Sequence, residues 1–407
     1  MARKTTNAAN NVAANEAELI KGVTYDSEPL VDEDIDTTDE ITAAKIEDGL
    51  YDPKKTQVEL DGLATISKEV KKSVAELSDN QIRIIIDSYY QTQAARIALE
   101  NQVRAVIQGY DENNKANILA VQWLLQDYKN RENQIKKMIE EYVKSVPVCS
   151  WAVAIKGIGP IFAANLYNYI NMDICKHANQ FLNYAGLNDN NIPWLGKEKA
   201  EAIVNEAYEE CGLKKTDKLN DEILIKVAEK SGRKFETVLK GFESHREKTS
   251  TGGDRVVLIK YLSKPPYNKE LKTICYLIGE AFCKVSNRGS LYGRIYRERK
   301  AWETMMNENL AYKEQAERML REKKYDTNTP TYKLMAEGKL SPAHINQRAK
   351  RYATKIFLTH FFEACWIDKY GTKPPVIYPI AFQDHVDYIE PEVPYSDYIS
   401  YKSEVVH

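Results

Sequence analysis

The chain has 407 residues and a formal net charge of −2, with 43% hydrophobic and 29% charged residues. This composition is typical of a folded protein with hydrophobic cores and excludes a chain that is disordered throughout. No run of about 18 or more apolar residues occurs, which excludes a transmembrane helix. The first residues also lack the apolar segment of a secretory signal, so we expect a cytoplasmic protein with no membrane partner.

The charge is distributed unevenly along the chain. Residues 1–60 contain 6 Lys and Arg against 14 Asp and Glu, and residues 384–407 contain one Lys against six acids. Residues 61–383 therefore carry a net charge of +11. A basic body between acidic tails is typical of a protein that binds a polyanion, with tails that compete for the basic surface or keep the free protein soluble. The alternative is an ordinary domain with solvated acidic tails.

The patterns of common catalytic and metal sites are missing. The six cysteines are scattered and form no Cys-x-x-Cys pair, so we expect no structural zinc. In a cytosolic protein they are expected to be reduced, mostly buried thiols. We also expect no cofactor. The sequence also contains no Walker loop, no HExxH and no nucleophile elbow.

In chain order, residues 1–60 are expected to form an acidic, largely disordered tail, and residues 61–147 a long helical hairpin or coiled coil. Apolar residues recur every three or four positions over 80–108 and again over 115–145, with a polar turn between them. Such a hairpin would be roughly 40 Å long. It would be either a dimerisation coiled coil or a spacer.

Residues 148–383 are expected to be mainly helical and to bind nucleic acid, and residues 384–407 to form an acidic tail. The pattern predicts helices over 271–285 and 342–366 and one long charged helix over 293–321. The best strand candidates are 146–155 and 374–382. The fold class is therefore mainly α.

The sharpest motif is Lys156-Gly157-Ile158-Gly159-Pro160, flanked by small and apolar residues, which is the signature of a helix-hairpin-helix. Gly157 and Gly159 would let the backbone turn tightly, and the amides opening the next helix would face a phosphate. Such a contact gives affinity without reading sequence. The alternative is a packing hairpin that binds nothing.

Basic residues concentrate after residue 241 and are candidates for contacts to a phosphate backbone. Tyr292 and Tyr296, interleaved with them, are candidates for stacking on unpaired bases. The alternative is a solvated helix balanced by Glu298 and Glu303. With the hairpin, the candidate nucleic-acid-binding residues are Lys156, Gly157, Gly159, Arg246, Lys248, Arg255, Lys264, Lys284, Arg288, Arg294, Arg297, Lys300, Arg348 and Arg351.

The segment GIGPIFAANLYNYINMDICKHANQFLNYAGL, 157–187, resembles the C-terminal domain of bridge-RNA-guided insertion-sequence transposases. Further matches follow in order at 250–253, at 262–264 and at Gly338-Lys339. The resemblance covers roughly 80–380, with an apparent insertion at about 188–245. It implies a catalytic serine: Ser250 stands at the nearest matching position, and Ser263 matches less well. As a lone residue in a Gly-rich turn, Ser250 is better interpreted as a helix or turn cap.

The chain departs from that family because its N-terminal RuvC-like nuclease domain is absent, which argues against strand cleavage. Two long helices followed by such a hairpin domain also resemble the Nop domain of box C/D RNA-guide proteins. They are similar as well to the Tas proteins of tandem-interspaced-guide-RNA systems, found in prokaryotes and their viruses, some of which lack a nuclease domain.

The resemblance implies a guide-RNA-binding protein that dimerises through its helical arm and directs recognition of a DNA target, in a bacterial, archaeal or phage-infected cell. The absent nuclease domain favours a protein that is not an enzyme. The alternatives are a DNA transposase or recombinase that uses Ser250 as nucleophile, and a non-catalytic structural adaptor.

Overall fold

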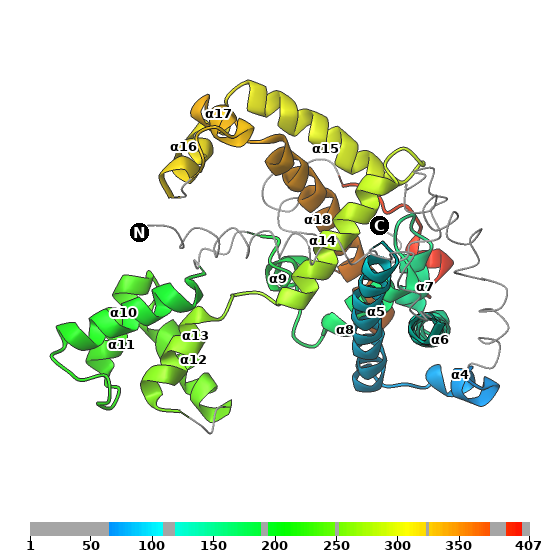
Figure 1. The fold of residues 1–407 in the computed structure, drawn as a ribbon, viewed down its shortest axis with the longest axis horizontal. Helices are drawn as coiled ribbons and strands as arrows, with labels where there is room; N and C mark the ends of the chain where they lie inside the picture. Colours follow the sequence, from blue (N-terminus) through cyan, green and yellow to red (C-terminus); the bar gives the residue numbers. More distant parts are fainter. Residues whose placement is uncertain are drawn as a thin grey trace, which may run out of the picture. The chain divides into compact units, whose positions relative to one another are not determined.

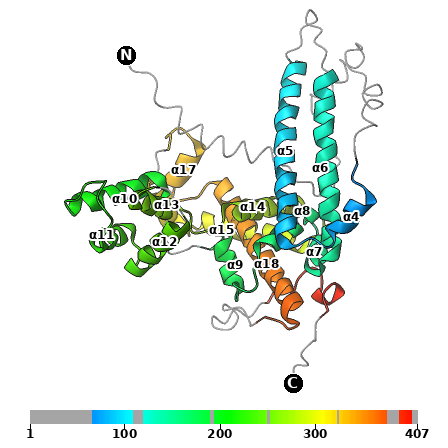
Figure 2. The same cartoon turned by 90° about the horizontal axis from the view of Figure 1, so that it is seen from below.

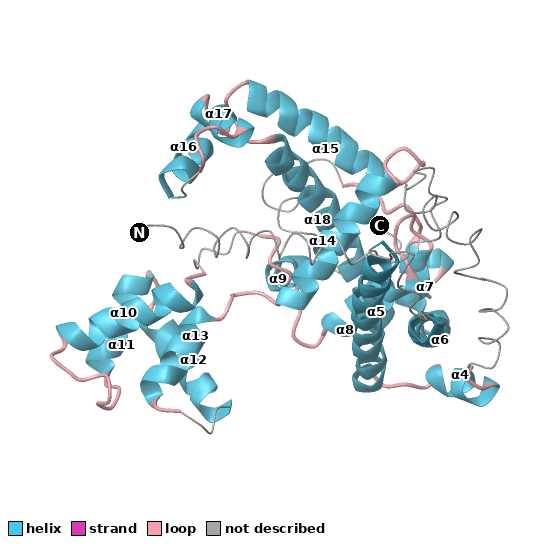
Figure 3. Ribbon diagram, viewed as in Figure 1, coloured by secondary structure: helices cyan, strands magenta, loops and turns pink. Residues whose placement is uncertain are grey.

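The structure is a computed structural model that describes residues 65–108, 119–188, 194–248, 252–322, 325–374 and 388–400. Throughout these residues the regular elements are α-helices and one 3₁₀ helix, with no strand (Figure 3). The prediction of a mainly α fold is confirmed. The predicted tail over 1–60 lies outside the described residues, as do 384–387 and 401–407 of the C-terminal tail.

The chain divides into two compact units. The first combines Met1–Ile174 with Leu277–His407, and the second is Cys175–Tyr276. The second unit encloses the segment of about 188–245 that the resemblance marks as an insertion.

The first unit begins with α4 (Lys68–Val74), α5 (Asp79–Gln108) and α6 (Leu119–Ser145). Figure 2 shows α5 and α6 lying side by side, as the hairpin prediction requires. The buried positions of α5 alternate four and three residues apart, which is the spacing of a coiled-coil seam. They are Ile82, Ile86, Tyr89 and Gln93, with Val103 further along the same seam.

A polar layer interrupts this seam. Glu132 of α6 accepts hydrogen bonds from Gln93 Nε2 at 3.0 Å and from Arg96 Nε at 2.5 Å. Arg96 also pairs with Glu100, and Glu100 with Lys129 of α6. The side chains of Arg96 and Glu132 are only 17% and 12% exposed. Because a shifted register would leave these charges unpaired, the layer specifies the alignment of the two helices.

Figure 1 shows the helices of the remainder of the first unit. Aromatic side chains from three of them form a core. Phe282, Tyr292 and Phe357 pack with ring centroids 5.0–5.5 Å apart. They come from three different helices, of which α15 and α18 pack along each other. The elements are α7 (Pro147–Val153), α8 (Pro160–Tyr169), α14 (Lys269–Lys284), α15 (Leu291–Glu308), α16 (Lys313–Glu322), α17 (Pro330–Ala336), α18 (Pro342–Tyr370) and η1 (Tyr395–Asp397).

Two predictions of secondary structure are wrong. The strand proposed over 146–155 contains α7, which begins at Pro147, a residue suited to the first helical position because that position needs no amide donor. The single helix over 293–321 is two helices, α15 and α16, separated where Leu310 adopts a φ of 59°. The second strand candidate falls almost entirely outside the described residues.

The second unit is a small helical bundle with its own core. Helix α10 packs on α11 and α13, and α12 packs on α11 and α13. Val204, Tyr208, Val227, Val238 and Leu258 are among the buried residues of this core. The helices are α9 (Ala178–Tyr184), α10 (Gly196–Glu210), α11 (Asp221–Ser231), α12 (Phe235–Lys248) and α13 (Asp254–Ser263).

Replacing Glu132 with Ala is expected to lower the stability of the arm by about 2 kcal/mol, because Arg96 and Gln93 lose their shared acceptor away from water. Hydrogen exchange of the α5 and α6 amides measures this loss. The control is Lys144→Ala, which removes an ion pair to Glu141 of the same helix, where both side chains are exposed (68% and 39%). Such an exposed pair is worth less than about 1 kcal/mol. Equal losses in the two variants would contradict the role of the polar layer.

Candidate nucleic-acid interface

The predicted hairpin forms between α7 and α8. Gly157 has a φ of +98°, a conformation that favours glycine. A Cβ placed on Gly157 would lie 3.3 Å from Val285 Cγ2 and 3.4 Å from Phe282 Cδ1. The turn therefore approaches the end of α14, and the glycine serves close packing within the protein.

The start of α8 offers few amides to a phosphate. Gly159 is the N-cap residue, Pro160 has no amide hydrogen, and Ile161 and Phe162 are buried. Of the two interpretations that the sequence left open for this motif, the structure favours the packing hairpin.

Lys156 connects the hairpin to the loop between α14 and α15. Its Nζ donates to the carbonyl oxygen of Arg288 at 3.2 Å, and its own carbonyl accepts from Ser290 Oγ at 3.4 Å. The hairpin thus supports the loop that precedes α15.

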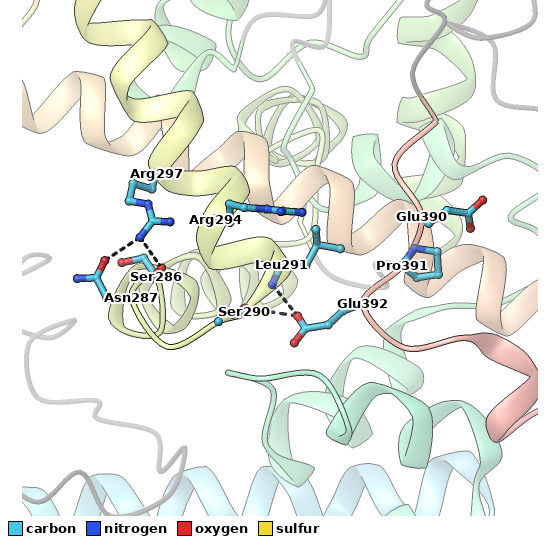
Figure 4. A pocket seen from close by; sticks show the side chains of 10 residues that line it. Ser286, Asn287, Ser290, Leu291, Arg294, Arg297, Glu390, Pro391 and Glu392 are labelled. Atoms are coloured by element: carbon cyan, nitrogen blue, oxygen red, sulfur yellow. Dashed lines mark hydrogen bonds between the residues drawn. The ribbon is translucent and has the colours of Figure 1, made fainter.

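A cavity of about 430 Å³ lies where this loop, the first turns of α15 and the segment 388–400 meet (Figure 4). Its lining combines two arginines of α15 with two acids of the C-terminal segment. The residues that define its chemistry are Ser286, Asn287, Arg294, Arg297, Glu390 and Glu392.

The two arginines of the cavity differ in how strongly the protein holds them. Arg297 Nη1 donates to the carbonyl of Ser286 at 3.1 Å and to Asn287 Oδ1 at 2.9 Å. Arg294 is 57% exposed, and its Nε lies 4.0 Å from the similarly exposed Glu298. Contacts of this kind between exposed groups are weak, so Arg294 is available to an anion from solvent.

Three further basic residues on this stretch of chain, Lys284, Arg288 and Lys300, are also exposed. We call Lys284, Arg288, Arg294, Arg297 and Lys300 the 284–300 cluster. All five charges of this part of the predicted interface face solvent.

Glu392 occupies the N-terminus of α15. Its Oε2 accepts from the Leu291 amide at 3.0 Å and lies 3.4 Å from Ser290 Oγ (Figure 4). A carboxylate is stabilised there by the unpaired amides and the helix dipole. Burial raises the pKa of Glu392, and the Leu291 amide and the charge of Lys156 oppose this shift.

The segment that carries Glu390 and Glu392 is held by buried contacts. Trp151 Nε1 donates to the carbonyl of Val393 at 2.8 Å, and His360 Nε2 lies 2.8 Å from the carbonyl oxygen of Ile389. Tyr395 is buried, and its hydroxyl donates to Glu363 Oε2 at 2.7 Å. Both acids are therefore positioned beside the arginines.

The prediction that Tyr292 and Tyr296 stack on bases is wrong. The two residues are 0% and 5% exposed. The Tyr292 hydroxyl lies 2.8 Å from His360 Nδ1, and the Tyr296 hydroxyl donates to Asn346 Oδ1 at 2.6 Å. Since both rings face the core side of α15, neither presents a surface to a base.

Three predicted contact residues form structural ion pairs. Arg348 Nε lies 2.7 Å from the buried Glu303 Oε2, Arg255 bridges Glu201 and Asn205, and Arg246 lies 3.3 Å from Asp254. Arg348 pairs with a buried carboxylate and Arg255 is itself mostly buried, so their charges are satisfied within the protein. Arg246 and Asp254 are 45% and 33% exposed, so their pair is weaker. Arg351 is exposed, and Lys248 and Lys264 line a cavity of the second unit.

Of the serine candidates, Ser250 lies outside the described residues. Ser263 ends α13 and donates from Oγ to the carbonyl of Lys260 at 3.1 Å, an ordinary helix-end contact.

Sequence reasoning missed Glu392 and His360. Glu392 belongs to a tail expected to be solvated, and nothing in the local sequence indicates that it caps a helix 101 residues away. His360 lies on the apolar face of the predicted helix over 342–366. That position is the one sequence feature that indicates a buried histidine.

All six cysteines are free thiols, and four are buried, as the sequence predicts.

Among the described residues no group of three His, Cys, Asp or Glu is arranged to hold a metal ion. Of the helices that the structure describes, none has both the length and the apolar character needed to cross a bilayer.

Comparison of the chain with protein-family models, curated proteins and solved structures finds no match. Its function is therefore argued from its own residues.

The His360 contacts predict a pH dependence of stability. Burial lowers the pKa of His360 to about 4, against about 6.5 when unfolded. Between these values the unfolded chain binds more protons, so His360 makes folding less favourable as pH falls. Its contribution should fall by about 2 kcal/mol from pH 7 to pH 4.5. Glu363 and Glu392, whose pKa values burial raises, act in the opposite direction.

His360→Gln separates these effects, because Gln can both accept from Tyr292 and donate to Ile389 without titrating. Urea unfolding of both proteins at pH 7 and pH 4.5 gives the comparison. The natural chain should lose about 2 kcal/mol more than the variant between the two values. The same pH dependence in both proteins would contradict a neutral, buried His360.

Proposed function

We propose that the chain is a guide-RNA-binding protein that directs recognition of a DNA target without a nuclease domain of its own. The observation that carries the proposal is the exposed 284–300 cluster beside a cavity. Charges that can neutralise phosphates supply most of the affinity for a nucleic-acid backbone. The resemblance of 157–187 to bridge-RNA-guided transposases supports RNA as the ligand. The resemblance of the arm and hairpin domain to Tas proteins supports it as well.

The proposal includes a homodimer formed through the arm. Val121, Trp123 and Leu124 near one end of α6 are exposed apolar side chains, which supports a partner surface there. Light scattering of the intact chain gives its oligomeric state.

The acidic C-terminal segment competes for the same surface. Glu390 and Glu392 line the cavity together with Arg294 and Arg297. A phosphate that approaches the arginines meets these carboxylates, so binding of nucleic acid is opposed by part of the protein itself.

Reversing three charges of the cluster (Lys284→Glu, Arg294→Glu and Arg297→Glu) is expected to weaken RNA binding by at least tenfold. It should also lower the salt dependence of the binding constant by about one unit for each phosphate that the protein no longer neutralises. Filter binding across a salt series measures both effects, with RNA that co-purifies with the natural chain and is identified by sequencing.

The control reverses three exposed residues of α16 and α17, Arg318, Arg321 and Lys333, and changes the net charge equally. Unaltered RNA binding in the cluster variant, or an equal loss in the control, would contradict the proposed surface. Natural protein that carries no discrete RNA would contradict a guide RNA.

Replacing Glu392 with Gln is expected to strengthen RNA binding by about threefold, because one competing charge is removed next to the arginines. The Gln carbonyl retains an acceptor for the Leu291 amide, so α15 keeps its cap. Binding at pH 8 is compared with that of Glu314→Gln, an exposed acid on α16. Equal or weaker binding by the Glu392 variant would show that this carboxylate does not compete.

A further inference from the structure

The second unit contains a cavity of about 420 Å³. One wall is α12, which contributes Gly241, Ser244, His245 and Lys248 at the spacing of a single helix face. The end of α13 and the loop after it contribute Tyr261, Lys264, Pro265 and Pro266, and Arg233 precedes α12.

A close contact between α12 and α13 places the aromatic surface of this cavity. A Cβ on Gly241 would lie 2.1 Å from Cε2 of Tyr261, so only glycine admits the ring at this position. The Tyr261 hydroxyl donates to the carbonyl of Thr237 at 2.9 Å. The His245 ring and the guanidinium carbon of Arg233 lie 5.7 and 5.5 Å from the centre of the ring.

The charge of the cavity is positive and is not neutralised by its lining. Arg233, His245, Lys248 and Lys264 line it, and none of its lining residues that the structure describes is Asp or Glu. The acids of the last turns of α12, Glu243 and Glu247, fall on another face of the helix by their spacing.

Within the described part of the chain, neither Lys248 nor Lys264 forms an ion pair. Arg233 Nη2 donates to the carbonyl of Leu262 at 3.4 Å, and its buried Nε has no acceptor in the described part of the chain. Burial, followed by the charges of Lys264 and Lys248, lowers the pKa of His245. Three positive charges therefore converge on one cavity, and none of the described residues supplies a counterion.

We propose that this cavity binds the phosphate monoester of a nucleotide or of the phosphorylated end of a nucleic-acid strand. A phosphate monoester carries a charge of about −1.5 to −2 near neutral pH, against −1 for a diester within a strand. The three cations stabilise the more highly charged group more strongly.

The size and the remaining lining suit the rest of a nucleotide. A volume of about 420 Å³ is within the range of small-molecule sites and exceeds what a phosphate group alone fills. The ring of Tyr261 and the two prolines provide apolar surface for a sugar or a base. The site does not depend on the proposed function, because its residues are separate from the 284–300 cluster.

Calorimetric titration of the full chain with adenosine 5′-monophosphate, adenosine and inorganic phosphate tests the site. Adenosine monophosphate is expected to bind at least tenfold more tightly than adenosine and more tightly than inorganic phosphate. Binding should raise the pKa of His245, because an anion offsets the two lysines, and NMR of the imidazole follows this change. Equal binding of the nucleotide and adenosine, or no binding of the nucleotide, would overturn the proposal.

Lys248→Gln with Lys264→Gln is expected to weaken nucleotide binding by at least tenfold. Both side chains are exposed, so the fold should be retained, and circular dichroism checks this. The control is Lys214→Gln with Lys215→Gln, which removes two exposed lysines of the same unit away from the cavity. Unchanged binding in the first variant, or the same loss in both, would overturn the assignment.

A short oligonucleotide with a 5′-phosphate, compared with its 5′-hydroxyl form, distinguishes the two sources of the phosphate. The comparison uses the variant with Lys284→Glu, Arg294→Glu and Arg297→Glu, which weakens binding at the 284–300 cluster. Preference for the phosphorylated form identifies a strand end, and equal weak binding of both forms beside tight nucleotide binding identifies a free nucleotide. If nucleotide binding survives while the natural chain binds no RNA, this inference stands and the proposed function fails.

Discussion

The first unit depends on the burial of one side of α15. Tyr292 packs between Phe282 and Phe357 and forms a hydrogen bond with His360, whose other ring nitrogen contacts the segment 388–400. This contact determines the rotation of α15 about its axis. Because Tyr292 and Tyr296 face inward, Arg294 and Arg297 face outward. The same interaction that forms the core therefore exposes the positive charges proposed to contact a phosphate backbone.

Burial divides the basic residues into two groups with different roles. Arg348 neutralises Glu303, which lies in the core, and Lys350 does the same for Glu280. Burial by itself would raise the pKa of Glu303, but hydrogen bonds from Tyr312, Arg348 and Arg299 outweigh it, and the pKa is lowered. Such residues stabilise the fold and cannot also neutralise phosphates. Net charge alone thus overstates the surface available to a polyanion.

The two cavities differ in whether acids of the lining offset their clustered positive charges. The first contains Glu390 and Glu392 from a distant segment, which offset the arginines of α15. The second has no acid among its described lining residues, so the repulsion among its cations is not offset there. An external anion gains more from the second cavity, since it displaces no carboxylate of the protein. The first is suited to a competitive surface, and the second to a small anionic ligand.

The sequence by itself determined the helical class, the two long helices of the arm and the turn at Gly157, because helical periodicity and glycine conformation are local properties. It also located the exposed basic stretch from Lys284 to Lys300. Only the tertiary structure decided which side of α15 is buried, that Glu392 caps a helix 101 residues away, and that Lys248 and Lys264 share a cavity. These features result from contacts between segments far apart in the chain, and local sequence patterns carry no information about which segments meet.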